Sequence, residues 1–224
     1  MIVARGGTLR LAHRGDWRRA PENSLEAMTA ALAIPRCDGL EFDVRTSADG
    51  LPILLHDATL QRVQGRLERP DQLSAAALGA LGVPTLASVL DATPAGAFLD
   101  VELKVVPGQA FVDVMVAARG PELRGTVVSS FAPDVLERVA GLAPSWPRWL
   151  NAVELEPETI STAIELGCRA VSVEWRAIDA RSMGRARSAG LDVAAFTVDR
   201  RSTFDRLARL GVVAACVEGA ALEG

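Results

Sequence analysis

Residues 39–57 read GLEFDVRTSADGLPILLHD and contain the clearest structural signals in the chain. In its first half, Glu41 and Asp43 alternate with large apolar residues, so a β-strand here points both carboxylates to the same side. Asp49-Gly50 is a strong two-residue hairpin signal before a second apolar run. We therefore predict a buried strand that carries two acids on one face and then folds back through a β-hairpin arm.

The hairpin also predicts where His56 lies. With the turn centred between Asp49 and Gly50, antiparallel pairing places Asp43 directly across from His56. The arm would rise above the end of the strand and return the imidazole to the level of the acidic pair.

Similar β-rich runs recur along the whole chain, with amphipathic helical patterns between most of them. The expected strands are Thr8–His13, Gly39–Arg45, Ala97–Lys104, Thr126–Phe131, Arg148–Ala152, Ala170–Trp175, Asp192–Val198 and Val212–Val217. The expected helices include Ser24–Ile34, Gln109–Arg119, Pro133–Leu142, Pro157–Leu166, Ala180–Ala189 and Ser202–Leu210. This alternation predicts an α/β fold of parallel strands joined by right-handed crossovers, and eight strands favour a closed TIM-type (β/α)8 barrel.

Two departures from a regular barrel are expected. Asp57–Gly96 is the longest stretch between consecutive strands, and its weak helical patterns at Gln72–Leu81 and Leu86–Leu90 indicate a small insertion over the rim (57–96). After the last strand only Glu218–Gly224 remain, which predicts a truncated last helix. We expect residues 1–224 to form a single domain.

The amino-acid composition argues against nucleic acids and membranes as binding partners. The net charge is −4, and residues of both signs are interspersed, so no broad positive field is available for nucleic acid or for an anionic membrane. No apolar stretch approaches the roughly eighteen residues of a membrane span. A small anionic substrate would need a local basic pocket. The oligomeric state is not predicted.

The cysteines indicate the compartment. Cys37, Cys168 and Cys216 are far apart and lie among small or apolar neighbours, which favours buried free thiols over disulfides. Met1–Gly7 has no apolar run of a signal peptide. We therefore expect a reducing, cytoplasmic location.

Three carboxylates are expected to converge. Glu102 and Lys104 lie two residues apart on the barrel strand that follows Glu41 and Asp43. Because side-chain direction repeats every two residues in a strand, they point to the same face of that strand. An all-carboxylate set suits hard cations such as Mg²⁺ or Ca²⁺, and such an ion polarises a bound phosphate. The alternative is that Glu41 and Asp43 form a solvated ion pair with Arg45 at the rim.

His13 and His56 are the only histidines in the chain, and each ends an apolar strand beside a charged residue. Such a pair is what general acid and base catalysis near neutral pH requires. Arg14 and Lys104 add positive charges that suit a phosphate. The alternatives are that the histidines are structural and that Arg14 and Lys104 simply neutralise the carboxylates.

At these residues the chain resembles the glycerophosphodiester phosphodiesterase family, of the phospholipase C-like phosphodiesterase superfamily. The resemblance runs nearly end to end and is densest in the first half. It is carried by His13-Arg14-Gly15, Pro21-Glu22-Asn23-Ser24, Gly39-Leu40-Glu41-Phe42-Asp43-Val44, Asp49-Gly50 with Pro52, His56-Asp57, Glu102-Leu103-Lys104, Ser129-Ser130-Phe131 and Phe196-Thr197-Val198-Asp199.

The resemblance implies hydrolysis of a glycerophosphodiester to glycerol 3-phosphate and an alcohol. One histidine would deprotonate the attacking water or glycerol 2-hydroxyl, and the other would protonate the departing alcohol; which does which stays open. The implied residues are a metal set of Glu41, Asp43 and Glu102, acid and base catalysts His13 and His56, and phosphate ligands Arg14 and Lys104.

Some residues depart from the family pattern or carry less certain roles. Phe196, Asp199 and Val217-Glu218-Gly219 replace Trp, Asn and a Thr-Asp-Pro-like ending, which bears on substrate preference more than on chemistry. Glu22 either favours the start of the first helix or orients a catalytic group from behind. Phe131, Trp175 and Phe196 either line the substrate pocket or close the top of the core.

Two other functions are compatible with the pattern. A lysophospholipase D-like enzyme on lipid substrates would be favoured by an exposed apolar ridge at the mouth, and the sequence offers no clear ridge. A catalytically silent barrel that binds a phosphorylated ligand would lack a histidine or a carboxylate, and none is missing.

Overall fold

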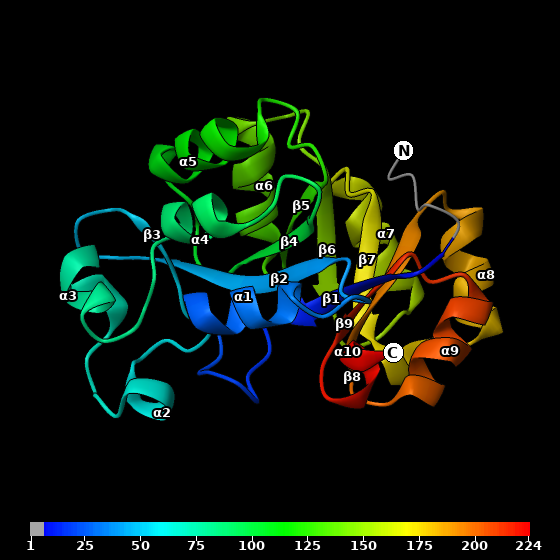
Figure 1. Cartoon of the computed structure of the whole chain (residues 1–224). Helices are drawn as coiled ribbons and strands as arrows, with labels where there is room; N and C mark the ends of the chain where they lie inside the picture. The colour runs from blue at the N-terminus through cyan, green and yellow to red at the C-terminus, as the bar shows by residue number, and fades with distance from the viewer. Residues whose placement is uncertain (1–6) are drawn as a thin grey trace.

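A computed structural model describes residues 7–224, so most of Met1–Gly7 lies outside the described range. Eight parallel strands form a closed barrel, because β1 pairs with both β2 and β9 (Figure 1). The strands are β1 Leu9–His13, β2 Gly39–Thr46, β3 Pro52–Leu54, β4 Phe98–Leu103, β5 Thr126–Ser130, β6 Arg148–Ala152, β7 Ala170–Glu174, β8 Asp192–Val198 and β9 Ala214–Val217. The predicted barrel is confirmed, and β3 lies outside the ring as the antiparallel partner of β2.

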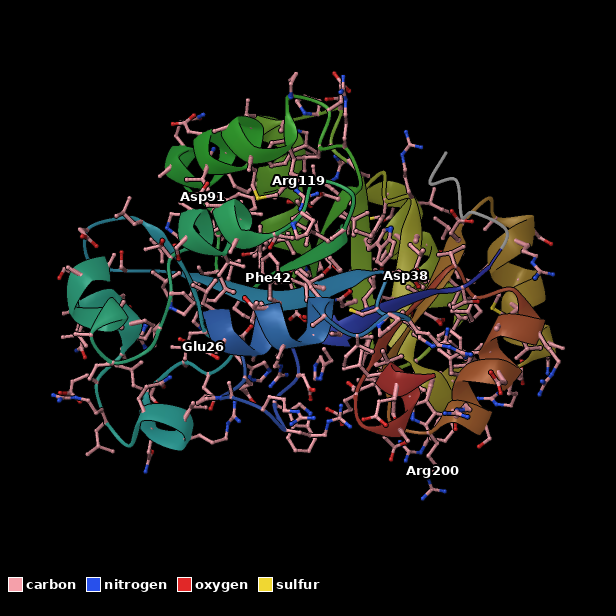
Figure 2. All side chains as sticks on the ribbon, viewed as in Figure 1. Glu26, Asp38, Phe42, Asp91, Arg119 and Arg200 are labelled. Atoms are coloured by element: carbon pink, nitrogen blue, oxygen red, sulfur yellow. The ribbon has the colours of Figure 1, made fainter. Side chains whose placement is uncertain are left out.

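Helices cover the outside of the barrel (Figure 1). Around the ring they are α1 Leu25–Leu32, α5 Gln109–Arg119, α6 Pro133–Leu142, α7 Pro157–Glu165, α8 Ala180–Ser188 and α9 Arg201–Leu210, with a 3₁₀ turn η2 Trp175–Ala177 after β7. Each helix turns a buried apolar stripe to the sheet; in α6 that stripe is Val135, Leu136 and Val139. Phe42, labelled in Figure 2, points outward from β2 and is fully buried in this shared core.

A second, smaller core closes the inside of the barrel. It consists of buried apolar side chains from six neighbouring strands of the ring, namely Leu11, Val127, Trp149, Ala170, Ala194 and Ala214. This apolar plug fills the barrel toward the amino ends of its strands. Polar side chains in the next layer therefore form the floor of any cavity at the carboxyl ends.

The segment between β3 and β4 is only partly an insertion. It contains α2 Gln61–Gln64, a 3₁₀ turn η1 Pro70–Gln72, α3 Ala75–Gly79 and α4 Leu86–Ala92. α4 packs against α1 and α5 and therefore takes the place of a barrel helix. The part that projects over the rim ends with α3, and it has its own small core that includes Ile53, Leu60 and Leu78.

The hairpin register differs from the prediction. The Leu55 N–H donates to the Asp43 carbonyl, 3.0 Å, so Leu55 and not His56 lies across from Asp43. The loop is one residue longer than the expected two-residue turn, because Ser47 N–H pairs with the Leu51 carbonyl and Gly50 adopts φ 80°. Such a three-residue loop ends in a left-handed glycine and shifts every later pair by one.

The last helix is short, as predicted: α10 spans Ala220–Glu223 and contacts α9 and β1. Arg18 ties it to the loop after β1 by donating to Glu223, 2.8 Å. Within residues 7–224 no helix is both long and apolar enough to cross a bilayer. The three cysteines are free thiols; Cys168 and Cys216 are buried and Cys37 is half-buried.

Candidate active site

A cavity of about 220 Å³ opens at the carboxyl ends of the barrel strands. It is lined by side chains from nearly every strand: His13, Arg14, Glu41, His56, Asp100, Glu102, Lys104, Phe131, Asn151, Ser172, Phe196, Thr197 and Cys216. A larger hollow of about 920 Å³ at the opposite end of the barrel contains none of the predicted site residues. The smaller cavity is therefore the candidate site.

The three predicted carboxylates do converge. One oxygen each of Glu41, Asp43 and Glu102 lies within 4.8 Å of the others, and all three residues are buried. Period two on β2 turns Glu41 and Asp43 inward, and Asp43 pairs in register with Glu102 of β4. Glu41 Oε2 is buried without a hydrogen-bond partner. This all-oxygen donor set fits a hard divalent cation.

Burial and mutual repulsion act on the pKa values of these carboxyl groups. Burial, followed by the nearby charges of Asp43 and Glu102, raises the pKa of Glu41 well above its usual range. Burial acts on Asp43 in the same direction, yet Lys104 and Arg14 outweigh it and hold its pKa low. The cluster therefore needs positive charge to stay ionised.

Arg14 and Lys104 supply such charge. Lys104 Nζ lies 2.9 Å from Asp43 Oδ1 and also contacts Glu102. Arg14 Nε lies 3.1 Å from Asp43 Oδ2. These contacts agree with the reading that both cations neutralise carboxylates. Both also line the cavity, so they face any anion that enters it.

The loop after β1 holds Arg14 in an unusual conformation. Arg14 has φ 57° and Asn23 has φ 58°, and the Asn23 N–H donates to the Arg14 carbonyl, 3.0 Å. Asn23 Nδ2 donates to Asp43 Oδ2, 2.8 Å, while its Oδ1 accepts the Asp43 N–H, 3.2 Å. Left-handed backbone in two non-glycine residues is costly and is typical of functional sites.

Asn23 does not cap the first helix. Ser24 takes that role instead, because its hydroxyl accepts the Ala27 N–H. Asn23 therefore remains free to orient Asp43, a role that local sequence does not reveal.

Each histidine has a carboxylate beside its Nδ1. His56 Nδ1 lies 2.6 Å from Asp57 Oδ1, and His13 Nδ1 lies 3.5 Å from Glu218 Oε2. The same Glu218 oxygen accepts the indole N–H of Trp17, 2.9 Å. These carboxylates leave Nε2 of each ring for other partners, and His13 Nε2 lies 3.8 Å from Glu41 Oε2. Sequence reasoning missed Glu218 and Trp17.

Arg45 does not pair with the acids of β2. Its guanidinium instead donates to the His56 carbonyl from Nε, 3.1 Å, and from Nη2, 2.9 Å. The alternative of a rim ion pair with Glu41 and Asp43 is therefore not what forms, and Arg45 fixes the backbone that carries His56.

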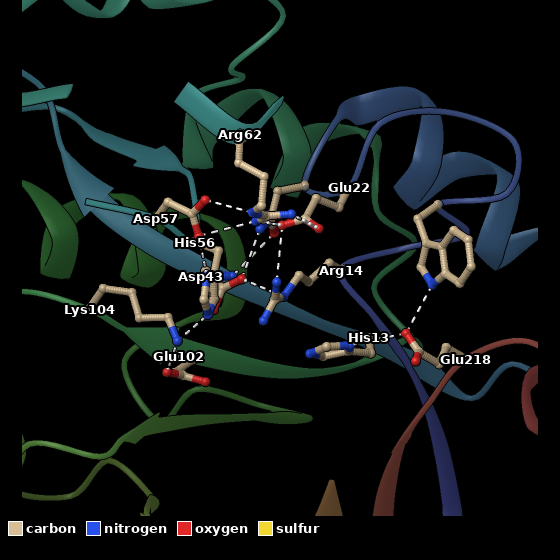
Figure 3. Close-up of polar contacts among 12 residues, drawn as sticks. His13, Arg14, Glu22, Asp43, His56, Asp57, Arg62, Glu102, Lys104 and Glu218 are labelled. Carbon is tan, nitrogen blue, oxygen red and sulfur yellow. Dashed lines mark hydrogen bonds and ion pairs between the residues drawn. The ribbon is translucent and has the colours of Figure 1, made fainter. Parts of the chain in front are cut away.

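A further arginine connects the two halves of the site (Figure 3). Arg62, on α2, donates to Asp57 and to Glu22, and Glu22 accepts from Arg14, 3.0 Å. Glu22 thus contacts two arginines, which favours the reading that it orients a site residue. Arg62 was not predicted, because its link to Glu22 spans 40 positions of sequence.

The floor of the cavity is polar and contains a buried acid that sequence reasoning passed over. Asp100 of β4 is 2% exposed, and burial raises its pKa to about 7, against the opposing effect of the Ser129 hydroxyl. Asn151 and Ser172 complete this layer above the apolar plug.

The aromatic residues divide into two groups. Phe131 and Phe196 line the cavity and meet edge to face at 5.5 Å, with Lys104 Nζ 5.8 Å from the Phe131 ring. Trp175 is outside the lining, and its ring lies beside Arg176 and Arg206. Its predicted role in substrate binding stays a prediction.

Comparison with known proteins assigns this chain to a family. The sequence profile of the glycerophosphoryl diester phosphodiesterase family matches residues 13–220. This chain belongs to that family. The glycerophosphodiester phosphodiesterase of Bacillus subtilis is 25% identical over 91% of this chain and 81% of its own length.

Solved structures agree with that family assignment. A phosphodiesterase of Oleispira antarctica, solved in complex with the product sn-glycerol-3-phosphate, superimposes with a TM-score of 0.82 at 25% identity, covering 94% of this chain and 93% of that one. The enzyme of Thermotoga maritima, at 19% identity and a TM-score of 0.79 over 96% of both chains, shares the fold.

Other curated relatives match only locally. The glycerophosphodiester phosphodiesterase of Caldanaerobacter subterraneus is 42% identical over 55 residues, which is 25% of this chain and 22% of that relative. The bovine glycerophosphodiester phosphodiesterase 1 is 46% identical over 52 residues, 23% of this chain and 15% of that protein. The chain thus spans under a quarter of the length of these relatives.

Proposed function

We propose that this protein hydrolyses glycerophosphodiesters to glycerol 3-phosphate and an alcohol. The observation that carries the proposal is the convergence, in one small cavity, of two histidines, two cations and a cluster of three carboxylates. Membership of the family and the likeness to the Oleispira phosphodiesterase support it.

Glu41, Asp43 and Glu102 are the proposed ligands of a divalent cation, Mg²⁺ or Ca²⁺. When bound, such an ion neutralises and polarises the phosphate oxygens. The buried, unpartnered Glu41 Oε2 and the raised pKa of Glu41 support a cation at this position.

Arg14 and Lys104 bind the phosphate in this proposal. Both line the cavity, and both are held by Asp43, which keeps them charged and aimed at one place. A guanidinium presents parallel N–H donors to a phosphate, whereas the ammonium acts as a compact charge.

His13 and His56 move the protons. One takes a proton from the attacking water or glycerol 2-hydroxyl, and the other gives a proton to the departing alcohol oxygen. If the 2-hydroxyl attacks, the alcohol leaves a cyclic glycerol phosphate, and water then opens that ring to give glycerol 3-phosphate. The carboxylates at both Nδ1 atoms support this, because they hold each ring with Nε2 available. Phe131 and Phe196 form the apolar wall that contacts the alcohol group.

A second candidate substrate is a lysophospholipid. Large apolar side chains that are exposed lie in segments that follow the carboxyl ends of strands at the mouth: Trp17, Leu67, Val106, Phe131 and Val153. Exposed apolar side chains by a site entrance favour a substrate with an apolar tail.

The free cysteines support a reducing compartment, and we propose that the enzyme acts in the cytoplasm on a small-molecule substrate.

The test is release of glycerol 3-phosphate from glycerophosphocholine and glycerophosphoethanolamine in Mg²⁺, in Ca²⁺ and in EDTA. We expect metal-dependent turnover that is lost in His13→Ala and in His56→Ala. Lysophosphatidylcholine as the preferred substrate supports the second candidate. No turnover of any diester by a folded, metal-binding protein rejects the proposal and favours a silent phosphate-binding barrel.

A further inference from the structure

The Arg62 guanidinium lies between two carboxylates and makes two hydrogen bonds to each (Figure 3). On one side, Nε and Nη2 donate to Asp57 Oδ2 and Oδ1, at 2.6 and 3.1 Å. On the other side, Nη1 and Nη2 donate to Glu22 Oε2 and Oε1, at 2.8 and 2.6 Å. Only a planar fork can satisfy both carboxylates at once.

Each of these carboxylates also contacts one residue of the candidate site. Asp57 Oδ1 lies 2.6 Å from His56 Nδ1. Glu22 Oε1 accepts from Arg14 Nη1, 3.0 Å. An unbroken chain of charged contacts therefore runs from the imidazole, through Arg62, to the guanidinium that faces the phosphate position.

We propose that Arg62 is a positioning residue that fixes His56 relative to Arg14. The inference rests on the proposed function, and it gives the rim insertion that carries α2 a role in catalysis. Arg62 lies in the insertion, away from the barrel strands, and its link to the site runs through Asp57 and Glu22.

The two side chains need such a link because β2 holds only the backbone beside each: the Arg14 N–H donates to the Glu41 carbonyl, 2.8 Å, and Arg45 donates to the His56 carbonyl. His56 follows β3, the short strand outside the ring, and Arg14 lies beyond β1 with a left-handed backbone. Small errors in the placement of reacting groups reduce rates strongly. A rigid bridge between the two loops removes that freedom.

Charge gives a second reason. Without Arg62, Glu22 and Asp57 would lose the cation that lies between them, and the two neighbouring carboxylates would repel each other. The hydrogen bond from Arg62 is the largest cause of the low pKa of Asp57, about 2. Loss of the bridge would free Asp57 and Glu22 to move, together with His56 and Arg14.

An ordinary surface ion pair is the competing explanation, because the Arg62 side chain is 48% exposed. Arg66 provides the matched control: its side chain is equally exposed, at 48%, it lies just past the same helix, and it pairs with Glu68 alone. An isolated pair of this kind contributes little to stability or activity.

The experiment compares Arg62→Met, Arg62→Lys and Arg66→Met with the wild type. Measurements are kcat and KM for the glycerophosphodiester that the wild type cleaves, and the inhibition constant of inorganic phosphate. We expect Arg62→Met to lower kcat/KM about 10- to 100-fold, mostly in kcat, and to weaken phosphate inhibition several-fold. Arg62→Lys keeps the charge but not the planar guanidinium, so its kcat/KM should fall between those of the wild type and Arg62→Met. Arg66→Met should match the wild type.

Double variants locate the effect. If Arg62 acts through Asp57 and Glu22, then Arg62→Met combined with Asp57→Asn, or with Glu22→Gln, is no worse than the more damaging single variant. Additive losses, or an Arg62→Met enzyme within twofold of the wild type, overturn the inference. So does a lowered melting temperature with unchanged kcat. Inactive wild-type protein, in contrast, is a failure of the proposed function itself.

Discussion

Glu218 Oε2 lies 3.5 Å from His13 Nδ1, so His13 has a carboxylate neighbour as His56 has Asp57. Glu218 comes from the loop after β9, almost at the end of the chain, and its hydrogen bond with His13 is the largest cause of its lowered pKa. The last strand thereby contributes to the environment of a residue on the first strand, which is possible because β1 and β9 pair to close the barrel.

We predict that Glu218→Gln lowers kcat/KM about tenfold, because a neutral amide holds the His13 ring in place less strongly than the carboxylate does. Steady-state kinetics across pH 5–9 check this. Trp17→Phe, which removes the other partner of the Glu218 oxygen, should have a smaller effect. A Glu218→Gln enzyme with wild-type kinetics would show that the contact is incidental.

Lys104→Met is expected to make the protein depend on a divalent cation for stability. Lys104 is a cation partner of both Asp43 and Glu102, and removal of one partner of a buried ion pair costs about 3 kcal/mol. Thermal melts in EDTA should show this loss, and Mg²⁺ or Ca²⁺ should raise the melting temperature more than in the wild type. An equal response of both proteins to metal would contradict the idea that lysine and cation neutralise the same carboxylates.

Gly15→Ala should destabilise the fold by roughly 2–5 kcal/mol. Gly15 has φ 83°, and a Cβ there would lie 2.6 Å from the backbone carbon of Ala27. Urea denaturation measures the effect. Gly50→Ala is the control, because Gly50 also has a positive φ but no atom lies within 4 Å of its added Cβ. Its loss of stability should therefore come from backbone strain alone and be smaller.

Asp57 should make the stability depend on pH in an acidic window. Its pKa is lowered from 3.8 to about 2, mainly by the Arg62 hydrogen bond, so the ionised form favours the folded state. That contribution is complete above pH 4 and is lost as the pH falls from about 4 to about 2. The difference in unfolding free energy between the wild type and Asp57→Asn should shrink over this range; a constant difference would reject the assignment.

Much of the fold follows from short-range patterns. The period of two in Gly39–Thr46 and the helical period of segments such as Pro133–Leu142 depend only on backbone geometry and on which side chains avoid water. These rules are local, so the order and the approximate bounds of the strands were predictable. The hairpin register was not, because one extra loop residue at Ala48–Gly50 changes the pairing.

The site residues also divide into those that the sequence could predict and those that it could not. The residues that end strands, such as His13, Glu41 and Glu102, were predictable because closure of a parallel barrel brings strand ends together. The residues that hold them were not. Glu218 and Asn23 act through contacts that only the closed barrel and its loops create.

The barrel, the strand-end acids and the pair of histidines could be predicted without coordinates, because periodicity and spacing act along the chain. The tertiary structure alone decided how those groups are held: Arg62 reaches Glu22 across 40 positions of sequence, and Glu218 reaches His13 across the seam of the barrel. Such charge pairs depend on three-dimensional proximity, which no local pattern encodes.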